Sequence, residues 1–528
     1  MLPAHVLSSE IGARRFSPVE LVDGLLERIR AADPKLHAFV EVYAEDARFA
    51  AEAADKAIRS GHAIGPLHGI PIALKDLIEI EGRVTTGGSE VWRNRRSRCT
   101  ATLARRLIAA GLIVIGKTHT VEFAMGGWGT NQHRGTPWNP WDPTTARTPG
   151  GSSSGSGVAV AAGFAPWAVG TDTGGSVRLP ASWCGLSGLK TTIGRVSTYG
   201  ILPLSPTLDT PGPMARSVED AALLYQVMQG PDALDSRTRG ITPIDPLPTL
   251  RRGVRGLRLA RMPEAECEDV DWEVLAAYNA ALESLARLGA EIVTVNLPCR
   301  FADYTTLTAR IIGAEGYFLL GDLIDDMGLP IDEAVRPRIA AGRGISARDY
   351  LGALRDREEA KRQFAAAMAD VDALLTPTTQ TVAIPLDAVD QASTPAHFTR
   401  FVNFLDLCAL ALPNGFTQAA CRSRCRSSAA AMTKRRPCAS GGPTSRRAIG
   451  TSAGRLVSSD TSQSGAAHVS AVGRVESVWR YPVKSMRGEQ LPEIFASFAG
   501  VWGDRLFAFR STATPVGFPI LPGGRRTG

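Results

Sequence analysis

The sequence has no long hydrophobic run and little that would mark a membrane or secreted protein. No apolar stretch reaches the roughly 18–20 residues needed to cross a bilayer, since the best candidate, 158–170, is shorter and rich in alanine and glycine. The N-terminus lacks the basic segment and apolar core of a secretory signal. Eight cysteines scattered over 528 residues exclude a disulfide framework. We therefore expect a cytoplasmic protein.

Basic residues outnumber acidic residues in the chain, and a single segment accounts for the whole excess. The formal net charge is +7, and the segment 416–470 alone carries nine Lys or Arg against one acid, Asp460. The rest of the chain therefore sums to −1. Apolar residues make up 44% and charged residues 21%, as in ordinary globular proteins. A balanced core with one basic insert gives no reason to expect nucleic-acid binding.

Apolar periodicity predicts alternating helices and strands in the first part of the chain. Ser17, Pro18 and Glu20 form a capping box with proline at the first helical position, and 21–29 repeats with helical period. Further helices are expected at about 45–60 and 102–110, and strands at 69–76 and 112–115. This alternation indicates an α/β sheet enclosed by helices.

Two runs rich in glycine and serine bracket a short strand-like segment. GGSSSGSG occupies 150–157 and GTDTGGSVRLPA occupies 170–181, with the strand-like segment at 167–170 between them. One such run is often only a flexible connector. Two of them, with Asp172 and Arg178 at fixed places in the second, favour a structured site.

These runs, together with Lys75 in an LKD context, resemble the amidase signature family. Further phrases similar to that family are GKTHTVEFA, TPWNPWDP, LKTTIGRVS and LDTPGPMARSVEDAALL. The resemblance covers about residues 8–415. It implies an α/β/α sandwich around a mixed central sheet, and an enzyme that uses neither a metal nor an organic cofactor.

The resemblance also implies a Ser–cis-Ser–Lys triad. Ser176 would be the nucleophile, Ser152, preceded by a cis peptide bond, the bridging serine, and Lys75 the base. A serine hydroxyl is a poor nucleophile until a base takes its proton. Lysine can be that base only when burial disfavours its charged form. Ser152 would relay the proton between the other two groups.

Backbone N–H groups of the second run complete the expected site. The resemblance implies an oxyanion hole formed by four consecutive residues, Thr173, Gly174, Gly175 and Ser176. Such donors face the charge that develops on the substrate oxygen. Asp172 and Arg178 are expected to pair and to hold this turn in shape, which is a structural role.

Each of these assignments has an alternative. Lys75 alone could be a surface lysine, Ser176 could cap a helix that begins at Val177, and Ser152 could belong to a linker. The run at 151–155 also has the G-x-S-x-G shape of an α/β-hydrolase elbow, with Ser153 as nucleophile.

That elbow would require a later acid and a histidine, and His397 and His468 are the only histidines downstream. A P-loop is disfavoured because no Gly-Lys-Ser/Thr follows the glycines. Cys421 and Cys425 lack the second pair that a zinc site needs. Three tryptophans could line an aromatic substrate pocket or could pack in the core: Trp128, Trp138 and Trp141.

The resulting hypothesis is an amidase that converts a small-molecule amide to an acid plus ammonia or an amine through an acyl-enzyme on Ser176. A homodimer is left open, and no membrane partner is expected. One alternative is a glutaminase that works with partner proteins, as the A subunit of the tRNA-dependent amidotransferase does. The sequence after GKT, HTVEFAMGGWGTNQHRGTPWNP, looks more like the stand-alone amidases.

The C-terminal part does not continue the resemblance. The segment 416–470 has almost no aliphatic residues and no periodicity. We hypothesise a one-nucleotide shift of the reading frame, because the restored frame could encode the apolar strand and closing helix that the family has there. An inactive, poorly folded product is therefore a further alternative, and sequencing the gene tests the shift.

The last segment, 471–528, regains ordinary character, with alternation typical of strands. VGRVESVWRYPVKSMRGEQL and VWGDRLFAFR resemble the β-rich N-terminal part of MOSC-type proteins. Because the MOSC core itself is missing, no molybdenum cofactor function follows. The predicted organisation is thus an amidase core at 1–415, an irregular segment at 416–470 and a β fragment at 471–528.

Overall fold

The fold is known from a computed structural model that describes residues 2–415, residue 417 and five short strands after them. The chain divides into two units, Met1–Thr451 and Ser452–Gly528. The predicted irregular segment 416–470 and the MOSC-like fragment 471–528 lie almost entirely outside the described residues, as do Cys421, Cys425 and His468. Those boundaries and the reading-frame hypothesis remain predictions.

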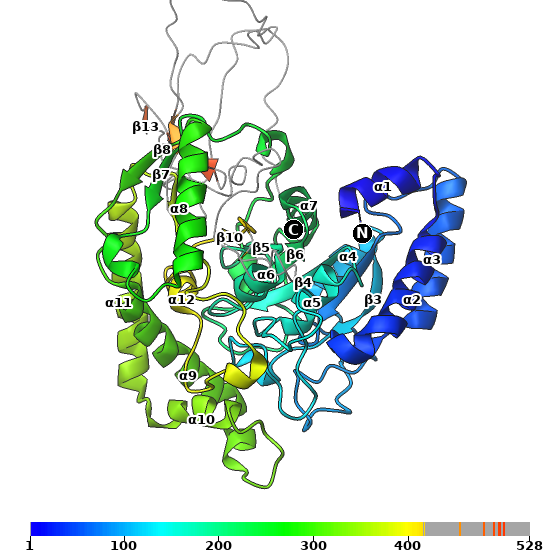
Figure 1. The fold of residues 1–528 in the computed structure, drawn as a ribbon, viewed down its shortest axis with the longest axis horizontal. Coiled ribbons are helices and arrows are strands. Elements are labelled where there is room, and N and C mark those ends of the chain that lie inside the picture. Colours follow the sequence, from blue (N-terminus) through cyan, green and yellow to red (C-terminus); the bar gives the residue numbers. More distant parts are fainter. Residues whose placement is uncertain are drawn as a thin grey trace, which may run out of the picture. The chain divides into compact units, whose positions relative to one another are not determined.

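Helices make up much of the first unit (Figure 1). They are α1 Ala4–Gly12, α2 Pro18–Leu36, α3 Ala44–Arg59, α4 Thr102–Ala109, α5 Ser154–Ala161, α6 Arg178–Cys184, α7 Val218–Met228, α8 Trp272–Arg287, α9 Phe301–Asp325, α10 Val335–Ala340, α11 Ala347–Ala367 and α12 His397–Phe404. No helix among the described residues is long and apolar enough to cross a membrane.

The strands form sheets in both units. In the first unit they are β1 Phe39–Val42, β2 Pro71–Lys75, β3 Ile113–Thr118, β4 Trp167–Asp172, β5 Ser187–Lys190, β6 Thr210–Ala215, β7 Arg258–Arg261, β8 Glu291–Thr294, β9 Ala373–Leu375 and β10 Ala409–Ala411. In the second unit they are β11 Gly454–Arg455, β12 Trp479–Arg480, β13 Glu489–Gln490, β14 Phe495–Ser497 and β15 Gly500–Val501.

A seven-stranded sheet organises the first unit, with the strand order β1-β3-β2-β4-β6-β5-β10. Its centre is parallel, because β2 runs parallel to both β3 and β4. The outer pairs are antiparallel: β1 with β3, β4 with β6, β6 with β5, and β5 with β10. The α/β fold with a mixed central sheet predicted from the sequence is therefore confirmed.

The first helices form as the sequence predicts. The Ser17 side chain accepts from Glu20 N, and the Glu20 side chain accepts from Ser17 N, which closes the capping box of α2. The apolar stripe of α2 is buried, including Leu21, Leu25 and Ile29. Helix α2 packs on α3, and α3 packs on β3 (blue in Figure 1). The capped, amphipathic helix α2 is thus joined through α3 to the sheet that carries Lys75.

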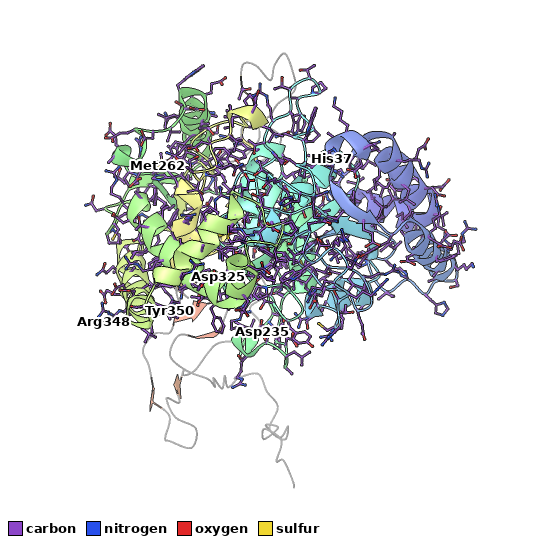
Figure 2. All side chains as sticks on the ribbon, turned by 90° about the horizontal axis from the view of Figure 1, so that it is seen from below. His37, Asp235, Met262, Asp325, Arg348 and Tyr350 are labelled. Atoms are coloured by element: carbon purple, nitrogen blue, oxygen red, sulfur yellow. The ribbon has the colours of Figure 1, made fainter. Side chains whose placement is uncertain are left out.

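A second, smaller layer was not anticipated from the sequence. Strands β8, β7 and β9 form a separate parallel sheet in that order. Its core is shared with α8, α9, α11 and α12. Glu315 of α9 accepts hydrogen bonds from Tyr350 Oη of α11 at 2.6 Å and from Thr207 N at 3.1 Å (Figure 2 labels Tyr350). This buried carboxylate ties the second layer to the loop that precedes β6.

The first glycine- and serine-rich run is partly helical. Helix α5 begins at Ser154, inside the run, and all its residues up to Val160 are buried. Gly155 is needed because a Cβ there would lie 2.2 Å from Ala38 O and 2.4 Å from His119 N. The run is therefore a packed helix start rather than a flexible connector.

Candidate active site

Lys75 is the last residue of the central strand β2 and is completely buried. Its Nζ lies 2.7 Å from Ser152 Oγ and 2.8 Å from Thr171 Oγ1. Both contacts are side-chain hydroxyls, and no ion pair of Lys75 is present among the described residues. A surface position for this lysine, the alternative from the sequence, is therefore wrong.

Burial changes the acid–base character of Lys75. Removal from water penalises the charged form and lowers the pKa of Lys75 to about 7. The negative charges of Asp209 and Asp172 act in the opposite direction but are smaller. Near neutral pH the amine is therefore uncharged in a substantial fraction of molecules.

Ser152 lies between Lys75 and the second glycine-rich run. The peptide bond between Gly151 and Ser152 is cis, which is the conformation that the resemblance implies at this position. Ser152 is fully buried, and its carbonyl accepts from Val121 N at 3.1 Å. The next residue, Ser153, donates its N–H to Ser176 O at 3.2 Å. This backbone bond brings the two serine segments together.

The turn that carries Ser176 is held by Asp172 and Arg178, the pair expected from the sequence. Arg178 Nε and Nη2 lie 3.0 Å and 2.9 Å from the two carboxylate oxygens of Asp172. The same oxygens accept from Gly175 N at 2.8 Å and from Val177 N at 3.1 Å. A buried bidentate ion pair thus fixes the backbone on both sides of Ser176.

Helix α12 braces this turn from more than 200 residues further along the chain. Asn403 Nδ2 donates to Asp172 Oδ1 at 2.9 Å, and Asn403 Oδ1 accepts from Arg178 at 2.6 Å. Thr399 Oγ1 donates to Gly174 O at 2.6 Å. Sequence reasoning missed Asn403 and Thr399, because neither belongs to a local motif of the site.

The backbone N–H of Gly175, one of the four expected in the oxyanion hole, already has an acceptor within the protein. Its N–H is engaged with Asp172 Oδ1, so it is not free to face a bound substrate in this conformation. Its φ is +140°, a conformation that side-chain-bearing residues rarely adopt. A Cβ at this position would lie 2.4 Å from Thr399 Oγ1.

Gly175→Ala should therefore lower both stability and activity. The added methyl has to displace Thr399 and strain the backbone, which we expect to cost about 2 kcal/mol or more of unfolding free energy. Urea unfolding and kcat measured on the same preparation test this. Gly344→Ala is the matched control, since nothing lies within 4 Å of a Cβ there. Equal stability of the two variants would contradict the expected clash.

A cavity of about 300 Å³ lies against Ser176. Thr173, Gly174 and Ser176 form one side of it, and Gly126 and Gly127 lie on its wall as well. Most other lining residues are apolar, and they come from α6, α9, the loops around 204 and 341–345 and the segments 124–125 and 392–396. The cavity therefore gives a small molecule access to Ser176, while Ser152 and Lys75 are fully buried and do not line it.

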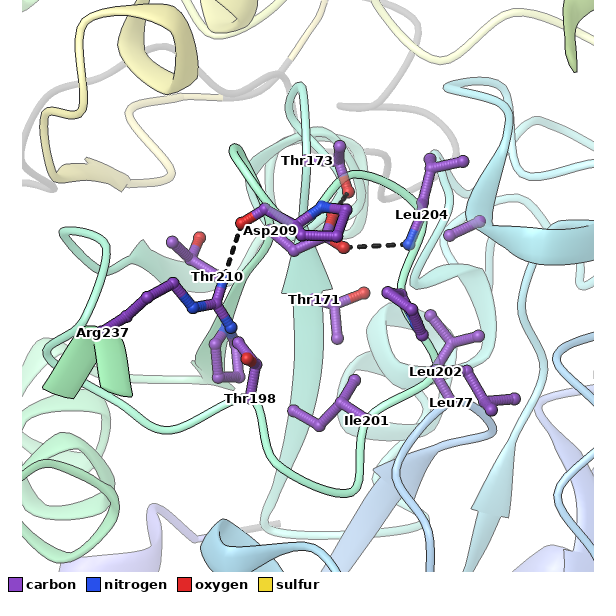
Figure 3. Close-up of a pocket in the computed structure, with 14 residues that line it drawn as sticks. Leu77, Thr171, Thr173, Thr198, Ile201, Leu202, Leu204, Asp209, Thr210 and Arg237 are labelled. Carbon is purple, nitrogen blue, oxygen red and sulfur yellow. Dashed lines mark hydrogen bonds between the residues drawn. The ribbon is translucent and has the colours of Figure 1, made fainter. Parts of the chain in front are cut away.

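A second cavity, of about 210 Å³, shares Thr173, Ala124 and Leu204 with the first as lining residues (Figure 3). Asp209 lines it and accepts from Thr173 Oγ1 at 2.5 Å and from Leu204 N at 2.9 Å. Burial raises the pKa of Asp209 to about 6. Asp209 thus orients Thr173. It is also one of the two acids whose negative charge raises the pKa of Lys75, against the larger effect of burial.

Two alternatives from the sequence do not fit this arrangement. Helix α6 starts at Arg178 with Val177 as its N-cap, so Ser176 does not cap it. Ser153 Oγ is buried. It donates a hydrogen bond to Thr171 O and accepts one from Thr171 N, both at 3.2 Å. His397, one of the two histidines that an α/β-hydrolase elbow could use, contacts Glu266 instead: its Nε2 lies 3.1 Å from Glu266 Oε2.

The tryptophans serve packing. Trp128 and Trp183 stack with their rings 5.4 Å apart, and Trp141 Nε1 donates to Cys184 O at 2.8 Å. Trp138 lies under the Lys35 ammonium. None of Trp128, Trp138 and Trp141 lines the cavity beside Ser176. Within the described part of the chain, no three His, Cys, Asp or Glu side chains gather as metal ligands.

Comparisons with known proteins agree on one family. The family profile described as Amidase matches residues 20–451. The glutamyl-tRNA(Gln) amidotransferase A subunit of Chloroflexus aurantiacus is 38% identical over 443 residues, which cover 79% of this chain and 91% of the relative.

Solved structures give the same picture. The native peptide amidase from Stenotrophomonas maltophilia superposes with a TM-score of 0.73 at 30% identity, covering 85% of this chain and 96% of that one. A chain of a vestigial protein complex connected with an s-triazine catabolic enzyme superposes with a TM-score of 0.76 at 30% identity. The match covers 85% of this chain and 97% of that one.

Proposed function

Because the chain belongs to the amidase family, we propose that it hydrolyses a carboxylic amide to an acid and ammonia or an amine, with Ser176 as nucleophile. The single observation that carries this proposal is the contact of buried Lys75 Nζ with Ser152 Oγ at 2.7 Å. Ser176 lines a cavity, whereas Lys75 and Ser152 are not among its lining residues. The proposal thus combines a base in contact with a hydroxyl and an accessible serine, Ser176, whose carbonyl accepts from the N–H of the residue after Ser152.

In the acylation step, Ser176 Oγ attacks the amide carbon. Ser152 accepts the proton of Ser176 and gives its own proton to the neutral amine of Lys75. The oxyanion formed on the substrate faces backbone N–H groups, for which Thr173, Gly174 and Ser176 remain after Gly175 N–H is engaged with Asp172. The proton then returns from Lys75 through Ser152 to the leaving nitrogen, and the C–N bond breaks.

In the deacylation step, water takes the place of the amine. Ser152 and Lys75 remove a proton from the water as it attacks the ester carbon of the acyl-enzyme. Collapse of the second oxyanion breaks the bond to Ser176 Oγ, which recovers its proton through the same relay. The net reaction consumes one water and one amide and leaves Lys75 neutral, so no cofactor is needed.

A second candidate function is that of a glutamyl-tRNA(Gln) amidotransferase A subunit, the name of the relative from Chloroflexus aurantiacus. Its 38% identity over most of both chains favours this candidate. The peptide amidase structure, at 30% identity, favours hydrolysis by a single chain. Both candidates use the same acyl-enzyme chemistry and differ in whether a partner receives the ammonia.

The purified chain, incubated alone with a panel of simple amides, distinguishes the two candidates. Ammonia or amine release without any partner protein is the expected result for an amidase. Release from glutamine only, and only after partner proteins are added, would favour the amidotransferase candidate. No acyl-enzyme by mass spectrometry with any amide would contradict both.

The pH dependence of kcat/KM is expected to follow the charge of Lys75. Only the neutral amine can accept a proton, so the rate should rise with pH through about 7 and level off above it. Below the pKa the slope should approach about one logarithmic unit per pH unit. Stopped rate assays between pH 5 and 9 measure this. A profile that is flat from pH 5 to 8 would contradict Lys75 as the base.

A further inference from the structure

Asp209 and Thr210, where β6 begins, contact the turn that carries Ser176 (Figure 3). Thr210 is the first residue of β6 and pairs with Asp172, the last residue of β4. Its Oγ1 donates to Asp172 O at 3.1 Å, and Asp209 Oδ1 accepts from Thr173 Oγ1 at 2.5 Å. Two consecutive residues of one segment thus hold two consecutive residues of the other.

The peptide group between Asp172 and Thr173 contains the first N–H of the proposed oxyanion hole. This peptide bond is trans, so its N–H points away from its carbonyl oxygen. That carbonyl, Asp172 O, also accepts from Asn403 Nδ2 at 3.2 Å, so two donors fix its direction. Threonine is stiff at χ1, so the hydrogen bond at Thr173 Oγ1 restrains the other side of the peptide group. The Thr173 N–H is therefore oriented before any substrate binds, as an oxyanion hole requires.

Among the described residues, the hydrogen bonds to Asp209 come from neutral donors only. Its second oxygen, Oδ2, accepts from Leu204 N and Ser205 N, both at 2.9 Å. Arg237 lines the same cavity but pairs with Asp235, with Nε 3.2 Å from Oδ1. Within the described part of the chain Asp209 has no ion pair. Its negative charge thus lies at the wall of the second cavity without a cation beside it.

The charge of Asp209 acts on Lys75. Thr171 lines the same cavity, and its Oγ1 lies 2.8 Å from Lys75 Nζ. Of the two acids that raise the pKa of Lys75 against the larger effect of burial, Asp209 has a stronger effect than Asp172. Burial, with a smaller contribution from the like charge of Glu315, raises the pKa of Asp209 to about 6. Asp209 is therefore mostly charged over the pH range in which Lys75 titrates.

We infer that Asp209 is a positioning residue for the reaction at Ser176, because its carboxylate holds Thr173 with the N–H directed at the developing oxyanion. This inference rests on the proposed amide hydrolysis and adds a residue to it. The charge of Asp209 has a second effect in the same reaction. Lys75 becomes an ammonium when it takes the proton of the nucleophile, and a nearby negative charge stabilises that form. Asp209 thus acts on both the oxyanion hole and the base.

Two variants separate the contact from the charge. In Asp209→Asn the amide oxygen can accept from Leu204 N and Ser205 N, and the amide nitrogen can donate to Thr173 Oγ1. This variant keeps the contacts and loses the charge. Thr173→Val keeps the shape of the side chain and loses the hydroxyl, whereas Thr173→Ser keeps the hydroxyl.

The readouts are the rate at which a fluorophosphonate labels Ser176 between pH 5 and 9, and kcat and KM for an amide that the wild type hydrolyses. In Asp209→Asn the midpoint of the labelling rate should move to lower pH by about half a unit or more, because the ammonium form of Lys75 loses a stabilising charge. Thr173→Val should lower the high-pH labelling rate and kcat by about 10-fold, with little change in KM. Thr173→Ser should keep both near the wild-type values.

Asp220→Asn is the matched control. Asp220 is a buried acid of α7 that accepts from Ala4 N at 3.0 Å and from His5 N at 2.9 Å, and it lines neither cavity. Its loss should leave the midpoint where it is. Urea unfolding shows that each variant is folded. A midpoint in Asp209→Asn no lower than that of Asp220→Asn, or a wild-type labelling rate in Thr173→Val, would overturn the inference.

Labelling separates this inference from the proposed function, because it requires no amide turnover. A lowered midpoint in Asp209→Asn, together with a lowered labelling rate in Thr173→Val, supports the role of Asp209 even if no amide is hydrolysed. Amide hydrolysis with the same kcat and the same pH profile in all these variants keeps the proposed function and overturns the role of Asp209.

Discussion

Ser176→Ala is expected to lower kcat for amide hydrolysis by about 10⁴-fold or more, because the acyl-enzyme can no longer form. Ser176 is only 7% exposed, but the cavity beside it is accessible to small molecules. A fluorophosphonate, which reacts with activated serines, should label the wild-type chain and fail to label this variant. Mass spectrometry of the intact protein gives the extent of labelling.

Ser153→Ala is the control for this experiment. Ser153 is the neighbouring buried serine, and its hydroxyl contacts only the backbone of Thr171 among the described residues. We expect this variant to be labelled at Ser176 as the wild type is. Labelling lost with Ser153→Ala and kept with Ser176→Ala would instead restore the α/β-hydrolase alternative.

Asp172→Ala is expected to cost about 3–5 kcal/mol of unfolding free energy, the largest stability effect of any single change proposed for this chain. The reason is that Arg178, whose side chain is only 3% exposed, would keep its charge without the buried partner. Gly175 N and Val177 N would lose their acceptor as well. The midpoint and slope of urea unfolding measure the change.

Asp23→Ala provides the comparison on the surface. Asp23 Oδ1 lies 2.7 Å from Arg48 Nε, and the two side chains are 50% exposed for Asp23 and 43% exposed for Arg48. Water screens such a pair, so its loss should cost less than about 1 kcal/mol. If Asp172→Ala were no more destabilising than Asp23→Ala, Asp172 and Arg178 would not hold the turn.

Several parts of the fold could be predicted because their signals are local. The capping box at Ser17 and Glu20 and the apolar stripe after it lie within one helix, so periodicity alone locates α2. The resemblance to the amidase family, now confirmed, predicted the mixed sheet. The separate sheet of β7, β8 and β9 went unnoticed, because its strands are short and residues that pair across it, such as Leu259 and Ala373, are far apart in the sequence.

The sequence by itself determined which side chains are available for chemistry: a lysine ending an apolar strand, and serines in two glycine-rich runs. Only the tertiary structure decided what these groups are able to do. Complete burial gives Lys75 its lowered pKa, and α12 brings Asn403 and Arg400 to the turn at 172–178. Desolvation and hydrogen bonds between residues 231 positions apart leave no local pattern, because they arise only when the chain is packed.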